Sequence, residues 1–291
     1  MLIFKLIIKF LLKIFFSKTY KKKLFLGKFF FKKIILNIYN FFPNRKLINF
    51  FLIAGSDKHD NHKDLYNALQ IYKANAKNIF EIGIGGHDFQ FSGGESLLAL
   101  SKFYIGSKVF GLDIVDKSFL NNEQILTFRG SQIDKKVLNK IIKRVKGFDI
   151  IIDDGSHFGT HQVKTFEIMF PRLNKGGVYI VEDLYGSFAR SFLGDAKMNK
   201  NKNIVANFKQ FIKNVYVEYI PNEFLSKLEK KFSINKVLFF NNSVFIQKCF
   251  NKKKKIINLK KANESIKYFN LRFKKNRAIK TQSGLIKYLK S

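Results

Sequence analysis

The sequence predicts an open α/β sheet, mostly parallel, with helices on both faces and an antiparallel hairpin at its C-terminal end. Three observations support this prediction. Short apolar runs alternate with helical patterns from residue 54 to residue 249, several runs end in glycine or acidic residues, and two late runs flank Asn241-Asn242. Alternating strands and helices are typical of a parallel sheet, because each helix returns the chain to the same end of the sheet.

The apolar runs define the expected strands, which in chain order are 78–83, 108–114, 125–131, 148–154 and 176–183. The run FDIIIDD at 148–154 is the most apolar, as expected for a strand buried on both faces. The helical patterns between them cover 94–104, 134–145 and 160–170. Over 236–249 two runs are joined by a pair of Asn residues, which tolerate turn backbone, and we expect a hairpin there. Five parallel strands closed by such a hairpin are the outline of a Rossmann-like, seven-stranded class I methyltransferase.

Residues 1–53 differ in style from the sheet domain at 54–249. Lys5, Lys9 and Lys13 form one stripe on an otherwise apolar helical pattern. Lysines interrupt every apolar stretch, which argues against a spanning helix and against a signal peptide. We expect residues 1–50 to lie on an anionic membrane surface, and the alternative is helices packed on the protein's own core. Residues 250–291 form a third region, a lysine-rich tail.

The formal charge of +33 on 291 residues comes mainly from lysine. Readers of nucleic acid depend on arginine for bidentate contacts, so this charge favours an anionic surface over nucleic acid as a partner. With Cys249 as its single cysteine the chain forms no internal disulfide. We expect a cytoplasmic protein, peripheral at the inner membrane face if residues 1–50 bind lipid, and the sequence is compatible with a homo-oligomer.

The first strand ends in a glycine-rich turn, FEIGIGGHDFQFSGGES, where an open sheet binds its ligand. Asp88 stands where the dinucleotide motif needs its third glycine, so that motif is not matched. Glu81 suits the ammonium of an amino-acid-like ligand, and Asp113, at the end of the second strand, can accept both ribose hydroxyls. Together these features indicate S-adenosylmethionine. The alternative for each acid is a solvated strand end or a cap.

Two acidic pairs end neighbouring strands, Asp153-Asp154 and Glu182-Asp183. Their mutual repulsion is costly unless a cation neutralises it, and all-oxygen ligands favour Mg²⁺. Caps and solvated acids are the alternative, which fits two adjacent pairs poorly. The side chain of Asp153 alternates away from that of Asp154, so the pair can serve two neighbouring sites.

His157 follows Asp154 by three residues, where we expect the next helix to begin with Ser156 as its N-cap. A helix N-terminus and a nearby cation both disfavour imidazolium, which would leave His157 neutral and able to accept a proton. His161 lies one helical turn further on, and we interpret it as a supporting or core residue.

Several segments together resemble the macrocin and mycinamicin O-methyltransferases and the related rhamnosyl and cephalosporin hydroxylase-like enzymes. These segments are GSDKHDNH, EIGIGG, GLDIVDKS, FRGSQID, FDIIIDDGSH and FPRLNKGGVYIVEDL, between residues 54 and 187. The resemblance implies Mg²⁺-dependent transfer of a methyl group from S-adenosylmethionine to a sugar hydroxyl, in surface glycan or glycoside biosynthesis. It implies His157 and Asp154 as catalytic residues and a metal held by Asp154, Glu182 and Asp183. The cofactor would be surrounded by Glu81, Gly83, Gly85, Asp113, Ser131, Gln132 and Asp153.

Two alternative functions remain at the level of sequence. The first is a metal-dependent O-methyltransferase acting on a catechol or another small diol, which uses the same metal chemistry. The second is a basic membrane- or RNA-binding protein on an inactive methyltransferase fold. The presence of both acidic pairs and of His157 argues against the second alternative.

Overall fold

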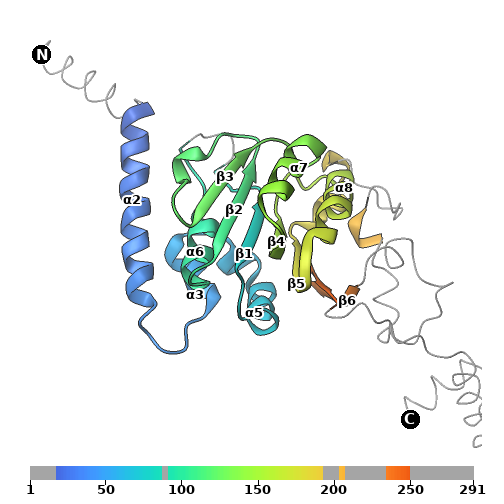
Figure 1. The fold of residues 1–291 in the computed structure, drawn as a ribbon, viewed down its shortest axis with the longest axis horizontal. Helices are drawn as coiled ribbons and strands as arrows, with labels where there is room; N and C mark the ends of the chain where they lie inside the picture. The colour runs from blue at the N-terminus through green and yellow to red at the C-terminus, as the bar shows by residue number, and fades with distance from the viewer. Residues whose placement is uncertain (1–17, 87–90, 193–202, 207–233, 250–291) are drawn as a thin grey trace, which may run out of the picture.

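A seven-stranded sheet forms the centre of the computed structural model, which describes residues 18–86, 91–192, 203–206 and 234–249 (Figure 1). Its spatial order is β3-β2-β1-β4-β5-β7-β6. The parallel strands are β1 (Asn78–Ile82), β2 (Lys108–Asp113), β3 (Ile125–Arg129), β4 (Phe148–Asp153) and β5 (Leu173–Val181). The hairpin of β6 (Ile234–Phe240) and β7 (Ser243–Lys248) adds to β5 through antiparallel β7. All the predicted strands are confirmed, and β5 begins three residues earlier than expected.

Helices cover both faces of the sheet, as predicted. They are α2 (Lys18–Tyr39), α3 (Leu47–Ala54), α4 (Lys58–Asn61), α5 (Lys63–Tyr72), α6 (Glu95–Phe103), α7 (Lys135–Arg144) and α8 (Gly159–Met169). Side chains alternate along β4, so Ile150 and Ile152 pack in the cluster with α3, α5 and α6, while Ile151 packs in the cluster with α7 and α8. Short 3-10 turns complete the connections, at Ser118–Leu120, Phe170–Arg172, Leu184–Ser187 and Arg190–Phe192.

The N-terminal segment contributes to this core before residue 54. Leu47, Phe50 and Phe51 of α3 are fully buried in the cluster that contacts α6. Helix α2 packs through Leu36 and leaves its opposite face exposed along one side of the molecule (Figure 1). Lys5, Lys9 and Lys13, like the tail at 250–291, lie outside the described residues. Within the described part of the chain, no helix combines the length and hydropathy needed to cross a bilayer.

The register of the central strands brings three strand ends together. Ile82 of β1 pairs with Asp153 of β4, and Asp153 pairs with Val181 of β5. The residues that follow these strands therefore leave the sheet side by side at its carboxyl edge. Gly83 passes so close to β4 that a Cβ there would lie 1.9 Å from the carbonyl oxygen of Asp154. Its φ of 79° also favours glycine, so the turn after β1 depends on this residue type.

Candidate active site

A buried lysine lies among the acids at this edge. Lys58, the first residue of α4, is 2% exposed. Its Nζ lies 2.7 Å from Oδ2 of Asp154 and 2.8 Å from Oε1 of Glu182, and it is 3.3 Å from Oε1 of Glu81. The acids come from the ends of β1, β4 and β5, so one ammonium group joins three strand ends. Burial alone would lower the pKa of Lys58, but the carboxylates of Asp154 and Glu182 raise it well above its ordinary value.

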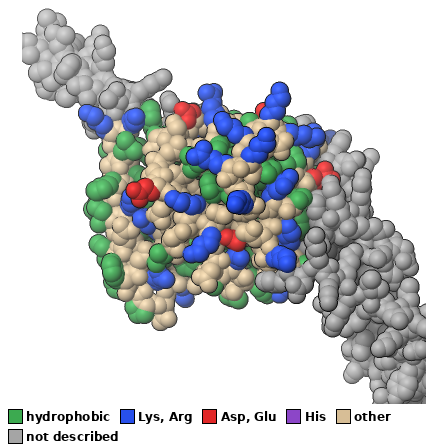
Figure 2. Space-filling view, in the orientation of Figure 1, with side chains coloured by type: hydrophobic (Ala, Val, Ile, Leu, Met, Phe, Trp, Pro, Cys, Tyr) green, Lys and Arg blue, Asp and Glu red, His purple; other side chains and the backbone are tan. Residues whose placement is uncertain are grey.

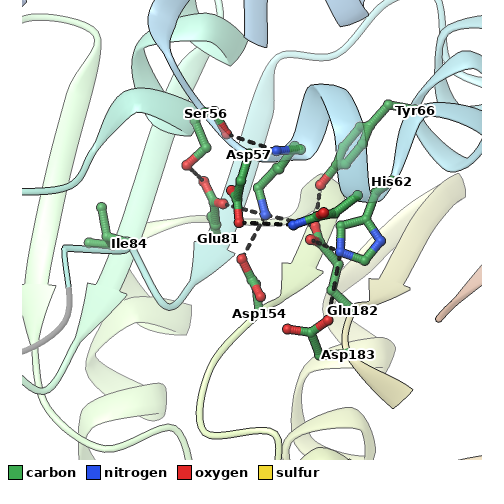
Figure 3. A network of polar contacts seen from close by, with 12 residues as sticks. Ser56, Asp57, His62, Tyr66, Glu81, Ile84, Asp154, Glu182 and Asp183 are labelled. Carbon is green, nitrogen blue, oxygen red and sulfur yellow. Dashed lines mark hydrogen bonds and ion pairs between the residues drawn. The ribbon is translucent and has the colours of Figure 1, made fainter. Parts of the chain in front are cut away.

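Glu182 is bound on both of its oxygens by the α4–α5 segment. Lys58 and the hydroxyl of Tyr66 donate to Oε1, and Nε2 of His62 lies 3.1 Å from Oε2 (Figure 3). Burial and the charge of Lys58 lower the pKa of His62, so a neutral ring can donate its Nε2 proton to the carboxylate. Burial raises the pKa of Glu182, which is 1% exposed, while Lys58 opposes that rise.

Lys58, His62 and Tyr66 were not singled out from the sequence. Their spacing of four residues is the signal that could have found them, because residues four apart share one face of a helix. In the structure the helix is interrupted: Lys58 begins α4, His62 lies between α4 and α5, and Tyr66 is in α5. The same spacing occurs on many solvated helices, so the spacing alone does not identify the carboxylate that these residues contact.

Asp154, Asp183 and His157 form a partly exposed group that could hold a cation. One ligand atom from each lies within 4.8 Å of the others. Carboxylate oxygens with one imidazole nitrogen suit a divalent ion. His157 and Asp183 have φ values of 59° and 52°, the left-handed region that side chains rarely adopt, and such strain clusters at functional sites. Two of the three predicted metal ligands thus meet His157, while the carboxylate of Glu182 faces α4–α5.

His157 lies in the loop before α8 rather than at the helix start. The helix begins at Gly159, so the prediction of Ser156 as its N-cap was wrong. The hydroxyl of Ser156 instead lies 2.8 Å from Nδ1 of His161, which supports the loop from within the helix. Nε2 of His157 lies 3.6 Å from Oδ2 of Asp183, and its Nδ1 is buried without a hydrogen-bond partner. The positive φ of His157 turns the chain before the helix begins, and no local sequence pattern predicts that turn.

The acids of the predicted cofactor side differ in exposure. Glu81 is fully buried, and its Oε2 accepts a hydrogen bond of 2.7 Å from Ser96. Burial raises its pKa to about 7, and its Oε1 has no hydrogen bond, with the ammonium of Lys58 as its nearest cation. Asp113 is partly exposed and accepts from two backbone amides, those of Ile84 at 3.0 Å and Val115 at 2.8 Å. It therefore holds the glycine turn against the end of β2 and keeps lone pairs for a ligand.

The side chains of Gln132 and Asp153 are buried and contact each other. Nε2 of Gln132 donates to Oδ1 of Asp153 at 3.0 Å, and its Oε1 accepts from the amide of Ser156 at 2.7 Å. Asp153 is 1% exposed, and burial raises its pKa to about 7. The alternation of Asp153 away from Asp154 is confirmed by these contacts. Ser131 is half-buried just before Gln132, and Gly85 has a φ of 73° in the glycine turn. Contact of these residues with a cofactor stays a prediction.

The sheet order, with antiparallel β7 between β5 and β6, is that of the class I S-adenosylmethionine-dependent methyltransferases. The acids lie at the edge where this fold binds ligands. Asp154 and Glu182 are each the first residue after their strand. Asp154 belongs to the candidate cation group, and both residues contact the buried Lys58, so the group and the lysine lie at that same edge.

The chain resembles sugar O-methyltransferases in particular. It is 38% identical over 125 residues to mycinamicin VI 2''-O-methyltransferase of Micromonospora griseorubida, covering 43% of this chain and 31% of that protein. It is 38% identical over 130 residues to demethylmacrocin O-methyltransferase of Streptomyces fradiae, covering 45% and 33%. The chain spans about a third of the length of these curated relatives. No family model matches it.

Solved structures agree with the sequence comparison. The MycE methyltransferase of the mycinamycin pathway, in complex with Mg, SAH and mycinamycin VI, superposes with a TM-score of 0.62 at 27% identity. The superposition covers 74% of this chain and 58% of that one. A second crystal form of the same enzyme, with Mg and SAH, has a TM-score of 0.61 at 28% identity.

Proposed function

We propose that the chain transfers a methyl group from S-adenosylmethionine to a sugar hydroxyl of a glycoside or glycan, with a divalent cation, Mg²⁺, at the carboxyl edge of the sheet. The observation that carries the proposal is the meeting of Asp154, Asp183 and His157 beside the glycine turn of a methyltransferase sheet. The relatives named as O-methyltransferases of mycinamicin VI and demethylmacrocin, and the MycE structures with Mg and SAH, support the same chemistry.

The cofactor and the cation would each supply one part of this reaction. S-adenosylmethionine would supply an electrophilic methyl group, and the cation would lower the pKa of the acceptor hydroxyl. Asp154 and Asp183 would hold the cation, with Glu182 as the further predicted ligand. His157 would take the hydroxyl proton on its ring nitrogen as the O–CH₃ bond forms and the S–CH₃ bond breaks, leaving S-adenosylhomocysteine. Positioning by the loop and charge stabilisation by the acids would supply most of the rate.

The cofactor side of the proposal can be tested at Asp113. Asp113→Ala is expected to weaken binding of S-adenosylhomocysteine by about 1–3 kcal/mol, because the ribose hydroxyls and the turn amides lose their acceptor. Isothermal titration calorimetry measures the change directly. Asp116→Ala is the matched control, since Asp116 also accepts from a backbone amide, that of Ser118, but is not predicted to contact the cofactor. Equal affinity in the Asp113 variant and the wild type would refute the assignment.

The acceptor class distinguishes the leading proposal from its alternative. A catechol or small diol would use the same cation chemistry, so the cation site does not separate the two. The sugar acceptor is favoured by a further relative, 38% identical over 145 residues, the 8-demethyl-8-alpha-L-rhamnosyl tetracenomycin-C 2'-O-methyltransferase of Streptomyces olivaceus, whose name specifies a rhamnosyl group. Methylation of a glycoside but not of catechol by the purified chain would support the sugar assignment.

We further propose that the exposed face of α2 docks on an anionic membrane surface, where a lipid-linked acceptor would be within reach. Phe30 and Phe31 are each 63% exposed and Phe41, just after the helix, is 89% exposed. Hydrophobic side chains gather along this side of the molecule (Figure 2). Helix α2 carries exposed Lys23 and Lys28 and has no acidic residue. Apolar burial and lysines near anionic lipid, each worth about 1 kcal/mol, would act together.

Vesicle sedimentation tests the docking surface. The full chain is expected to sediment with anionic vesicles, less at high salt, and Phe30→Ser with Phe31→Ser should release most of it. Ile71→Ser is the control, because Ile71 is 77% exposed on α5, away from this face. Deleting residues 1–52 would be a poor test, since that deletion removes buried Phe50 and Phe51. If the chain stays in solution with anionic vesicles, or if the variant loses self-association instead, the membrane proposal is wrong.

A further inference from the structure

The buried ammonium of Lys58 is the feature that the proposed reaction does not use. It reaches the acid edge from α4, ahead of the first strand, and contacts Asp154, Glu182 and Glu81 within 3.3 Å. Two of these contacts, at 2.7 and 2.8 Å, have the length of charge-assisted hydrogen bonds. A lysine is almost never this deeply buried unless it is paired, so the burial of Lys58 depends on these carboxylates.

The dependence is mutual. Glu81 and Glu182 are at most 1% exposed, and Asp154 lies beside them with its side chain 25% exposed. Three carboxylates this close repel one another strongly in a region that water barely reaches. In the described residues around them, the ammonium of Lys58 supplies a positive charge within 3.3 Å of all three carboxylates.

We propose that Lys58 is an internal counter-ion that competes with the divalent cation for the carboxylates of Asp154 and Glu182. This inference rests on the proposed function, in which that edge binds the cation. Without the cation, the ammonium bridges the acids and offsets part of their charge, so the fold does not require the metal. With the cation present, the ammonium opposes it through its charge and occupies one oxygen of Asp154 and one of Glu182, so metal affinity is kept below what the acids alone would give.

A purely structural ion pair would behave differently. Loss of a structural partner lowers stability and loosens the acids, which would leave metal affinity unchanged or weaker. A competing counter-ion predicts the opposite sign for affinity. Its removal frees one oxygen of Asp154, leaves Oε1 of Glu182 with Tyr66 as its donor, and removes a repulsive charge. The metal dissociation constant therefore separates the two roles, and the melting temperature alone does not.

The experiment uses the full chain with Lys58→Met, which keeps an unbranched side chain only one atom shorter and removes its charge. Calorimetric titration with MgCl₂ is expected to give a dissociation constant at least about tenfold lower than in the wild type. In the absence of metal the variant should melt at a lower temperature, and Mg²⁺ should raise that temperature more than it does in the wild type. Lys63→Met is the control, because Lys63 is exposed on the neighbouring helix.

Each outcome decides the proposal. Unchanged or weaker Mg²⁺ binding in folded Lys58→Met overturns the counter-ion role while leaving the proposed function intact. Absence of Mg²⁺ binding in both the wild type and the variant overturns the metal site together with this inference. If Lys58→Met does not fold without metal, Lys58→Gln and refolding in the presence of Mg²⁺ replace the titration. Recovery of the fold by Mg²⁺ then supports the role, and failure to recover overturns it.

Discussion

Asp154→Asn is expected to abolish Mg²⁺ binding and to lower methyl transfer by at least about 10²-fold, the scale of losing a main electrostatic contact in an active site. The physical reason is that an amide carries no charge for a divalent ion, while its oxygen can still accept from Lys58. The side chain is 25% exposed, so the fold should survive the change. Methyl transfer to a glycoside and calorimetry with MgCl₂ measure the two effects.

Asp60→Asn is the matched control for this prediction, because Asp60 is 79% exposed and pairs with His59 at the surface. Glu182→Gln is a less specific test. Its carboxylate binds Lys58, His62 and Tyr66, so a change there would alter the packing of α4–α5 as well as any metal site. Full activity of the wild type in excess chelator would show that the reaction does not need the metal.

Replacing His157 is expected to lower kcat by about 10²–10⁴-fold, the usual scale for loss of a general base, and to spare affinity for S-adenosylhomocysteine. The backbone complicates the choice of substitution, since His157 has a φ of 59°. Asn adopts this region more readily than Ala. His157→Asn therefore removes the base with the least backbone strain, and His157→Ala serves as the comparison.

The pattern across three variants distinguishes the base from the backbone. If the imidazole is the base, both His157 variants should be equally slow. If the rate depends on the backbone turn at His157 instead, only His157→Ala should be slow. His161→Ala is the control, because His161 contacts Ser156 and lies outside the candidate cation group. A normal rate in His157→Asn would contradict the role of His157 as base.

Hydrophobic patterning and the acidic strand ends are enough to predict the sheet and the edge that carries the chemistry. The run FDIIIDD is short, rich in β-branched isoleucine and bounded by glycine, which favours a buried strand. Neighbouring parallel strands bring their carboxyl ends together, so Asp154 was expected beside Glu182 and Asp183. The glycine turn at Gly83 could also be predicted from the local sequence, because few residue types permit such a close approach to the neighbouring strand.

The partners of these acids depend on how distant elements of the chain pack together. Lys58 lies 96 residues from Asp154 and 124 from Glu182 in the chain, and no periodic pattern links a short helix to strand ends so far away. The left-handed turns at His157 and Asp183 likewise depend on surrounding contacts that hold the backbone there. The physical reason is that hydrophobic periodicity specifies which face of a segment is buried, whereas a polar side chain's partner is set by how whole elements pack.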